Sequence, residues 1–191
     1  MVTSASGQST LAHVEDVWGT FVSLHLLGSD AAALAATRDE IVAFLHHVDD
    51  VFSSYREDSV LRRWHRGETP PTAELQEVLA VAGTVAVLTH GAFDATWNGE
   101  PDPTGLVKGW AVDRAIEIAA SHGVTDLVIN AGGDLSTRGS SSSGAPWQVA
   151  ISDPADRSKV VMTVVGNDLN VAMSGLNEQG EHIRCRSVRT S

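Results

Sequence analysis

Hydrophobic residues in the first half of the chain recur with the helical period of about 3.6 residues. Asp30 is followed by such a pattern, whose apolar positions are Leu34, Ile41, Leu45, Val48 and Phe52. Asp is a preferred N-cap residue, so we predict a helix that begins after Asp30 and buries one stripe of its surface. A short helix is predicted over Ser59–His65. A longer helix is predicted to begin at Pro70-Pro71-Thr72 and to end at Gly91.

The second half changes from a helical to an alternating pattern. A helix is predicted over Lys108–Ser121, and Gly123 ends it. Alternation then predicts strands over Asp126–Asn130, Trp147–Ser152, Lys159–Val165 and Asp168–Met173. We expect Gly166-Asn167 to form a hairpin turn between the last two strands, and Ser140–Ser143 to form a flexible loop.

The beginning of the chain supplies one more strand. Residues 1–16 are predicted to be disordered, whereas Trp18–Leu26 alternates well enough for a strand that ends at Gly28. Helices and strands therefore segregate along the chain more than they alternate. This order favours an α+β fold, with helices packed on a mainly antiparallel sheet, over a doubly wound parallel sheet.

The length and the net charge of the chain narrow the range of possible functions. The chain has 191 residues, which suits one domain with a sizeable core. Its formal net charge is −11, so we predict no nucleic-acid binding and no binding to an anionic membrane, because both need a basic face. The sequence shows no transmembrane segment, and residues 1–16 lack the pattern of a signal peptide. We therefore predict a cytoplasmic protein, or an exported one whose signal has been removed.

The segment from Asp102 to Asp134 carries the most chemical information. A polar Asp-Pro-Thr-Gly turn leads into Lys108-Gly109 at the predicted head of a helix, and the next strand ends in Gly132-Gly133-Asp134. Backbone N–H groups at a helix N-terminus are unpaired within the helix and carry the positive end of its dipole. This turn can therefore hold a phosphate, with Lys108 adding a full charge. It matches neither a P-loop nor a dinucleotide-binding glycine motif.

Together with other segments, this stretch resembles the FAD:protein FMN transferases, the ApbE-type flavin transferases. The other segments, in that family's order, are Val17-Trp18-Gly19-Thr20, Phe52-Ser53-Ser54-Tyr55-Arg56, Gly91-Ala92-Phe93-Asp94, Trp147–Pro154 and Ala172-Met173-Ser174-Gly175. The resemblance covers roughly residues 17–183, which we treat as one flavin transferase-like domain.

The resemblance implies a set of residues that hold FAD. They are Trp18, Tyr55, Ala92, Phe93, Asp94, Asp102, Lys108 and Ile183, with Trp18 standing where the family often has Met. Aromatic rings can pack on the flavin or adenine ring, carboxylates can accept hydrogen bonds, and Lys108 can lie on the pyrophosphate. Each assignment has an alternative: core packing for Phe93 and Tyr55, and a place in a turn for Asp94.

The resemblance also implies a metal site. In it the backbone carbonyl of Gly105 is a ligand of Mg²⁺, and FAD phosphates and carboxylates complete the coordination shell of the ion. The family's other carboxylate ligands come from a segment with no match here. His182 begins the family's His-x-x-Asp-Pro-x-Thr-Gly segment and is the candidate general base, with Asp94 as a second candidate. The match then stops, and residues 184–191 form an Arg-rich tail. We therefore expect an incomplete family domain.

The function implied is magnesium-dependent transfer of FMN from FAD to a Ser or Thr hydroxyl of an acceptor protein, with release of AMP. Its partners are FAD and that acceptor protein. Three alternatives stay open. Water can replace the hydroxyl, which gives an FAD pyrophosphatase. The chain can instead bind flavin without catalysis, or only pair with another protein.

Overall fold

The computed structural model describes residues 2–3, 9–97, 99–153, 155–156 and 158–172. The helices are α1 (Ala31–Phe52), α2 (Val60–His65), α3 (Ala73–Leu88) and α4 (Thr104–Ser121). The strands are β1 (Val2–Thr3), β2 (Ser9–Val17), β3 (Thr20–Gly28), β4 (Asp126–Ala131), β5 (Asp134–Arg138), β6 (Trp147–Ser152), β7 (Val160–Gly166) and β8 (Asn170–Val171).

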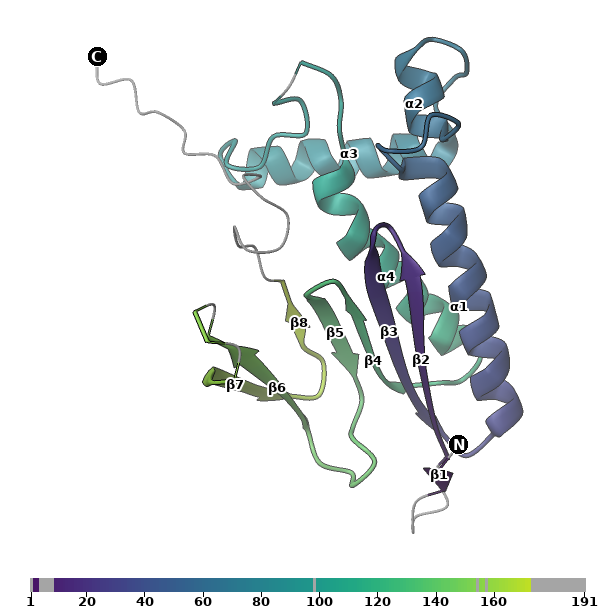
Figure 1. Cartoon of the computed structure of the whole chain (residues 1–191), viewed down its shortest axis with the longest axis vertical. Helices are drawn as coiled ribbons and strands as arrows, with labels where there is room; N and C mark the ends of the chain where they lie inside the picture. The colour runs from purple at the N-terminus through teal and green to yellow at the C-terminus, as the bar shows by residue number, and fades with distance from the viewer. Residues whose placement is uncertain (1, 4–8, 98, 154, 157, 173–191) are drawn as a thin grey trace.

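The strands form one large sheet and one ribbon. The large sheet has the order β1-β2-β3-β4-β5-β8, and all its neighbouring strands are antiparallel. The ribbon consists of β6 and β7. Helices α1 and α4 cover one face of the large sheet, while α2 and α3 lie beyond its upper end (Figure 1). The predicted α+β fold with a mainly antiparallel sheet is confirmed.

Strand β2 corrects the prediction that residues 1–16 are disordered, which is wrong for residues 9–16. Ser9–Val17 pairs with β3 along its whole length, from Ser9 opposite Gly28 to Val17 opposite Thr20. Its inward positions include the polar His13 and Glu15, and its exposed Val14 is apolar, so its alternation is weak in sequence. Pairing satisfies the backbone, and the inward Leu11 and Val17 are buried.

Strand β5 was not predicted, because its sequence is polar. Ser136 and Thr137 are nevertheless buried, and their polar groups are satisfied by the segment around β8. The Thr137 amide donates to the Leu169 carbonyl at 2.8 Å, and the Thr137 hydroxyl donates to the Asn167 carbonyl at 3.0 Å. These bonds draw β8 to β5, so the predicted hairpin at Gly166-Asn167 is wrong: β7 pairs with β6 instead.

Two hydrophobic clusters share helix α1. Its first half, including Leu34, Ile41 and Leu45, packs against the sheet and α4. Its second half, with Val48 and Phe52, packs against α2, α3 and the start of α4. As predicted, Asp30 caps α1, since its carboxylate accepts from the amides of Ala32 and Ala33. Among the described helices, none has the length and apolar character needed to cross a membrane.

Candidate functional site

Two hairpin turns meet at the upper end of the large sheet. Trp18-Gly19 joins β2 to β3, and Gly132-Gly133 joins β4 to β5; all four residues have positive φ, as two-residue hairpin turns require. The Gly132 amide donates to the Phe21 carbonyl at 3.3 Å. A Cβ added to Gly132 would lie 2.7 Å from Thr20 Oγ1, so a side chain at this position would force Thr20 to shift in addition to straining the backbone. The fold thus brings together two of the predicted motifs.

Lys108 points to the second of these turns. Its Nζ lies 3.7 Å from Asp134 Oδ2, and the two side chains are 25% and 27% exposed. The predicted place of Lys108 at the head of its helix is wrong, because α4 begins one turn earlier, at Thr104. The Asp102 carboxylate accepts from the Thr104 amide at 3.0 Å, and Pro103 can occupy a helix start at little cost. The positive charge therefore lies at the junction of α4 and the β4–β5 turn.

The loop between α3 and α4 covers the first turn of α4. The Asp102 amide donates to the Ala95 carbonyl at 2.6 Å, which closes the loop. The Phe93 ring lies 3.4 Å from where a Cβ of Gly105 would be, so Gly105 lets the ring approach the helix backbone. Phe93 is half-buried, whereas Ala92 and Asp94 are exposed.

Asp94 has hydrogen bonds within its own loop. Its Oδ1 accepts from the amide and from the hydroxyl of Thr96, both at 2.8 Å. Asp94 therefore stabilises a turn, which was the alternative that the sequence analysis gave for this residue. Because the carboxylate is exposed, this role leaves it reachable from solvent.

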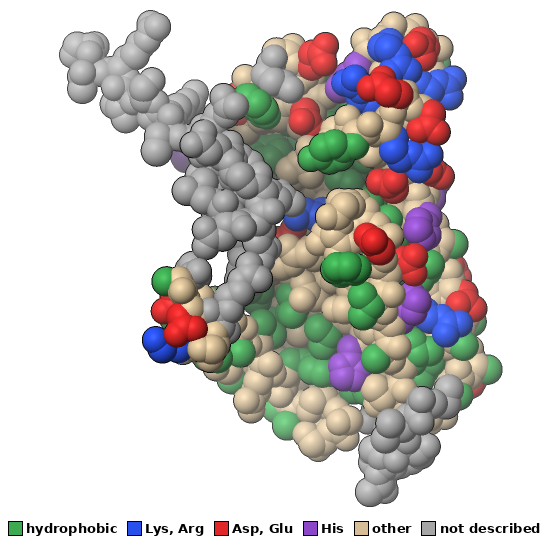
Figure 2. All heavy atoms as spheres, viewed as in Figure 1, with side chains coloured by type: hydrophobic (Ala, Val, Ile, Leu, Met, Phe, Trp, Pro, Cys, Tyr) green, Lys and Arg blue, Asp and Glu red, His purple; other side chains and the backbone are tan. Residues whose placement is uncertain are grey.

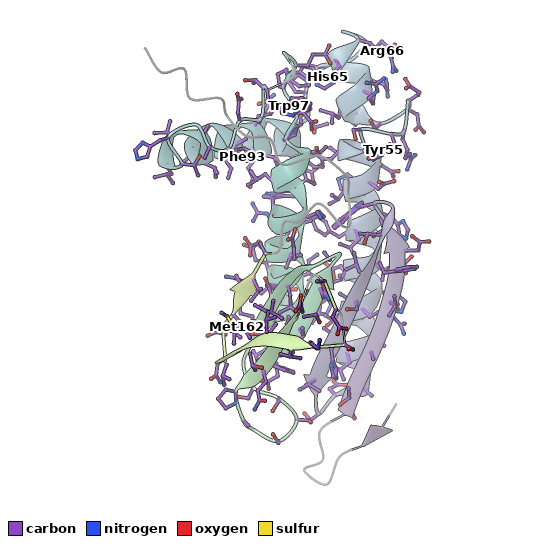
Figure 3. All side chains as sticks on the ribbon, turned by 60° about the vertical axis from the view of Figure 1, so that its left-hand side comes forward. Tyr55, His65, Arg66, Phe93, Trp97 and Met162 are labelled. Carbon is purple, nitrogen blue, oxygen red and sulfur yellow. The ribbon has the colours of Figure 1, made fainter. Side chains whose placement is uncertain are left out.

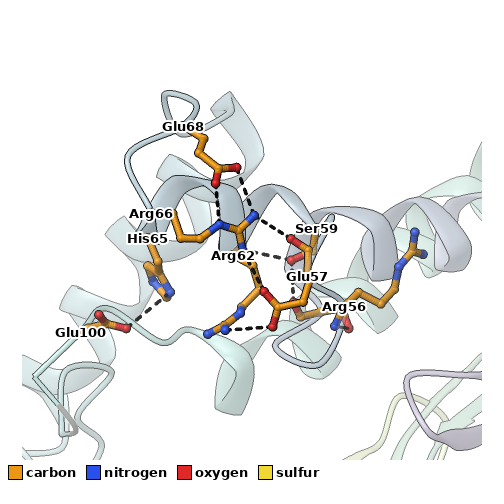
Figure 4. A network of polar contacts seen from close by, with 9 residues as sticks. Arg56, Glu57, Ser59, Arg62, His65, Arg66, Glu68 and Glu100 are labelled. Carbon is orange, nitrogen blue, oxygen red and sulfur yellow. Dashed lines mark hydrogen bonds and ion pairs between the residues drawn. The ribbon is translucent and has the colours of Figure 1, made fainter.

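Tyr55 projects into solvent from the loop that follows α1. Its side chain is 91% exposed, so it is not a packing residue of the described fold. Arg56 holds this loop through ion pairs with Asp58, Asp50 and Asp49, and the hydrogen bonds to these carboxylates, with Asp58 first, raise the pKa of its guanidinium. The buried Ser59 hydroxyl donates to the Ser53 carbonyl at 2.7 Å. Figure 4 shows how this part of the chain continues into the ion pairs around α2.

Two views place these groups relative to the sheet. Figure 3 shows Phe93 and Tyr55 in the upper part of the molecule, beyond the end of the sheet where the two hairpin turns meet. In Figure 2, charged side chains of both signs gather over α2 and the adjoining end of α1, while the face over the sheet is largely uncharged. On this face the charged side chains are therefore densest at the end that holds α2, with smaller groups at the left-hand side and along the right-hand edge.

Strand β6 begins near the other end of the sheet, where the Trp147 indole donates to the Arg138 carbonyl, and its middle residues approach the β4–β5 turn. A small cavity of about 90 Å³ separates it from the β4–β5 turn. The cavity is lined by Asn130, Gly133, Leu135, Val149, Ala150, Ile151 and Val171. The Asn130 side chain also accepts from the Gly133 amide at 3.0 Å. The cavity is far too small for a dinucleotide, but it places residues 149–151 beside the glycine turn.

Trp18 has a structural role in the described fold. Its indole N–H donates to the Leu45 carbonyl at 3.1 Å, and its ring packs against both hydrophobic clusters. Its left-handed φ of 62° is uncommon for a bulky residue and marks a strained turn. The turn is thereby fixed to α1. His182 and Ile183 lie outside the described residues.

Asp134 is the principal site residue that sequence reasoning did not select. The signal was present, because an acidic residue directly follows the Gly132-Gly133 pair. Its importance becomes visible only when the fold brings Lys108 to it. Thr20 was missed for the same reason, since it contacts the β4–β5 turn from the β2–β3 hairpin. Asn130 was also missed, although it lies in β4 and bonds to the turn only three residues ahead.

The described residues do not by themselves form a metal centre. Among them, no group of three or more His, Cys, Asp or Glu side chains converges in a way that could hold an ion. Two carboxylates of this region have partners within the chain: Asp134 pairs with Lys108, and Asp102 accepts from the Thr104 amide. Gly105 lies within the first turn of α4. This donor set does not meet the six-oxygen preference of Mg²⁺.

The fold and site define an α+β domain with a partly buried lysine at a junction of glycine turns. The chain belongs to the ApbE family, whose model matches residues 18–99 and 100–186. It is 26% identical to an FAD:protein FMN transferase of Klebsiella pneumoniae, over 91% of this chain. It spans 66% of the length of that relative, and 61% of one from Salmonella typhimurium.

Solved structures show the same fold. An ApbE protein from Thermotoga maritima superimposes with a TM-score of 0.77 and 21% identity, over 89% of this chain and 72% of that one. The flavin transferase ApbE from Vibrio cholerae superimposes with a TM-score of 0.74 and 22% identity, over 96% of this chain and 75% of that one.

Proposed function

We propose that this chain binds FAD at the end of the sheet where the two hairpin turns meet, with the pyrophosphate on Lys108. The observation that carries the proposal is the Lys108–Asp134 pair. A partly buried ammonium lies there beside a turn whose glycines allow close approach of a ligand to the backbone. The family membership and the names of the relatives support FAD as the ligand.

The proposed reaction is transfer of FMN to a protein hydroxyl. The oxygen of an acceptor Ser or Thr attacks the phosphorus on the FMN side of the pyrophosphate. The bond from that phosphorus to the bridging oxygen breaks, and AMP leaves with the bridging oxygen. The hydroxyl proton goes to a base, for which His182 and Asp94 are the candidates. Lys108 stabilises the negative charge that builds up on the leaving phosphate.

Tyr55 and Phe93 are the proposed ring contacts. Tyr55 is exposed on a loop that the ion pairs of Arg56 restrain, so ordering the loop backbone adds little to the cost of binding a ring there. Phe93 presents an aromatic face beside the start of α4. We propose that the same FAD site is also lined by Ala92, Asp94 and Asp102.

Magnesium is the proposed metal of the transfer, on the strength of the resemblance alone. Bound there, it would neutralise charge on the phosphates. Gly105 is its proposed backbone ligand. Since the described residues do not complete its shell, we expect the chain to need further oxygen donors from FAD. A flavin-binding protein without catalysis is therefore the second candidate function, favoured by the absence of a carboxylate cluster among the described residues.

Two measurements separate these functions. Flavin fluorescence titration reports binding, and AMP release from FAD, with and without a chelator, reports cleavage. The transferase predicts binding, magnesium-dependent AMP release and flavin attached to an acceptor protein in a denaturing gel. Binding without AMP release would support the second candidate. AMP release without attached flavin indicates an FAD pyrophosphatase. No flavin binding contradicts the proposal altogether.

A further inference from the structure

His65 is the last residue of α2 and points to the loop that leads into α4. Its side chain is 13% exposed, and Figure 4 shows the imidazole directed toward Glu100 in that loop. Its Nε2 lies 2.8 Å from the carbonyl oxygen of Pro101, a residue 36 positions away in the sequence. A carbonyl oxygen only accepts, so Nε2 carries the proton of this hydrogen bond. The bond therefore selects the Nε2–H tautomer of the neutral ring, with Nδ1 3.7 Å from Glu100 Oε2.

This hydrogen bond acts on a peptide group that is held from both sides. The Pro101 carbonyl accepts from His65. The N–H of the same peptide group belongs to Asp102 and donates to the Ala95 carbonyl at 2.6 Å. Because a peptide group is planar, two bonds at its opposite sides fix its orientation. The Asp102 carboxylate in turn accepts from the Thr104 amide at the start of α4. His65 therefore fixes the backbone from which the Asp102 side chain projects.

Helix α2 is itself fixed in the fold. The Ser59 side chain caps its N-terminus and donates to the Ser53 carbonyl at 2.7 Å, which ties α2 to the end of α1. Leu61 is buried in the hydrophobic cluster that α2 shares with α1, α3 and α4. The loop that carries Tyr55 is thus joined to one end of α2, and His65 joins the other end to the loop before α4. Helix α2 links two segments that carry proposed FAD contacts.

We propose that His65 is a positioning residue of the FAD site. Its Nε2–H holds the Pro101–Asp102 peptide group, so that the Asp102 carboxylate and the start of α4 keep a fixed place relative to Tyr55. The inference rests on the proposed function, because Asp102 and Tyr55 are proposed contacts of FAD. A site that is already in its bound arrangement loses less free energy to ordering when the ligand binds. His65 acts through Asp102 and does not need to touch FAD.

Two amide side chains of different length separate the hydrogen-bond donor from the rest of the ring. The side-chain nitrogen of Gln takes about the place of Nε2 in His, and that of Asn takes about the place of Nδ1. His65→Gln can therefore keep the bond to Pro101, whereas His65→Asn cannot, and both replacements are polar and neutral. Exchange of the Asp102 amide hydrogen, followed by NMR without flavin, should be about three- to tenfold faster in the Asn variant. In the Gln variant it should stay within about twofold of the unmodified chain.

Flavin fluorescence titration connects this bond to the site. The dissociation constant for FAD should rise about three- to tenfold in the Asn variant and stay within about twofold in the Gln variant. The matched control is His122→Asn, which changes a histidine paired with Glu40 beyond the other end of α4 and should leave FAD binding unchanged. Equal amide exchange or equal FAD affinity of the Asn and Gln variants overturns the proposal.

Two further results keep the test independent of folding and of the proposed function. Thermal melts show whether each variant is folded. If the Asn variant does not fold, ¹⁵N NMR of the imidazole in the unmodified chain decides, at about pH 8, where a free imidazole is neutral. The Nε2–H tautomer of His65 is expected, and the Nδ1–H tautomer overturns the proposal. If the unmodified chain does not bind FAD, the proposed function fails first, and the role of His65 in an FAD site fails with it.

Discussion

Replacing Lys108 by alanine is the sharpest test of the proposed pyrophosphate site. The change removes the ammonium 3.7 Å from Asp134. It also leaves the Asp134 carboxylate without this partner, so that a like charge faces the incoming phosphates. Both effects act on the pyrophosphate and spare the isoalloxazine ring. We therefore expect FAD to bind more weakly, while riboflavin binding is nearly unchanged.

The size of the loss in FAD binding free energy follows from the partial burial of the Lys108 site. Two unit charges about 4 Å apart interact by about 4 kcal/mol at an effective dielectric constant of about 20, which is an upper bound before desolvation. Hydrogen bonds to charged groups contribute about 1.5–3 kcal/mol net. Lys108 is 25% exposed, so we expect a loss within that range. The dissociation constant for FAD should rise roughly 10- to 150-fold.

Flavin fluorescence titration measures both ligands under one set of conditions. The chain has one other lysine, Lys159, which is exposed and distant in sequence, so Lys159→Ala is the matched control. The double variant Lys108→Ala with Asp134→Asn should regain part of the lost affinity, because it removes the unpaired carboxylate. Equal losses for FAD and riboflavin, or no loss for either, would refute the assignment of Lys108 to the pyrophosphate.

Three further predictions concern the turn, the pH dependence and the candidate base. Gly132→Ala should lower the free energy of unfolding in urea by about 2–5 kcal/mol, because it combines a left-handed φ with the contact to Thr20 Oγ1. The control Gly19→Ala, which has open space around it, should lower this free energy by about 1–2 kcal/mol. Equal losses for the two variants would disprove the clash with Thr20. Hydrogen bonds with His13 and His46 lower the pKa of Glu15, so its stabilisation is present above the ordinary carboxyl pKa of about 4.3 and is lost as pH falls through the lower, folded value. Glu15→Gln should flatten the decline of melting temperature in that acidic range; an unchanged decline would contradict this. Asp94→Asn should reduce AMP release far more than the melting temperature, and a variant that fails to fold would give Asp94 a structural role only.

Local signals in the sequence were sufficient for the elements that depend on them. The cap at Asp30 and the start after Thr72 were predictable because a side chain bonds to amides two or three residues ahead. Strand β6 was found at its observed bounds, Trp147–Ser152, from alternation alone. These features need no information from distant parts of the chain.

Elements stabilised by distant partners were missed or misplaced. Strand β5 is polar, and its buried Ser136 is satisfied by the Asn170 side chain at 2.8 Å, a partner that no local pattern identifies. The same bonds take β8 away from β7. In the site, the sequence selected Lys108 but not Asp134, since their contact arises only when α4 crosses the end of the β4–β5 hairpin. The meeting of Gly132 with Thr20 is likewise a product of the sheet order.

A crystal structure of this chain with FAD tests the central claim most directly. The account predicts that the pyrophosphate lies within hydrogen-bonding distance of Lys108 Nζ, beside the Gly132-Gly133 turn, with the isoalloxazine or adenine ring against Tyr55 or Phe93. FAD bound elsewhere, with Lys108 still paired to Asp134 alone, would contradict it.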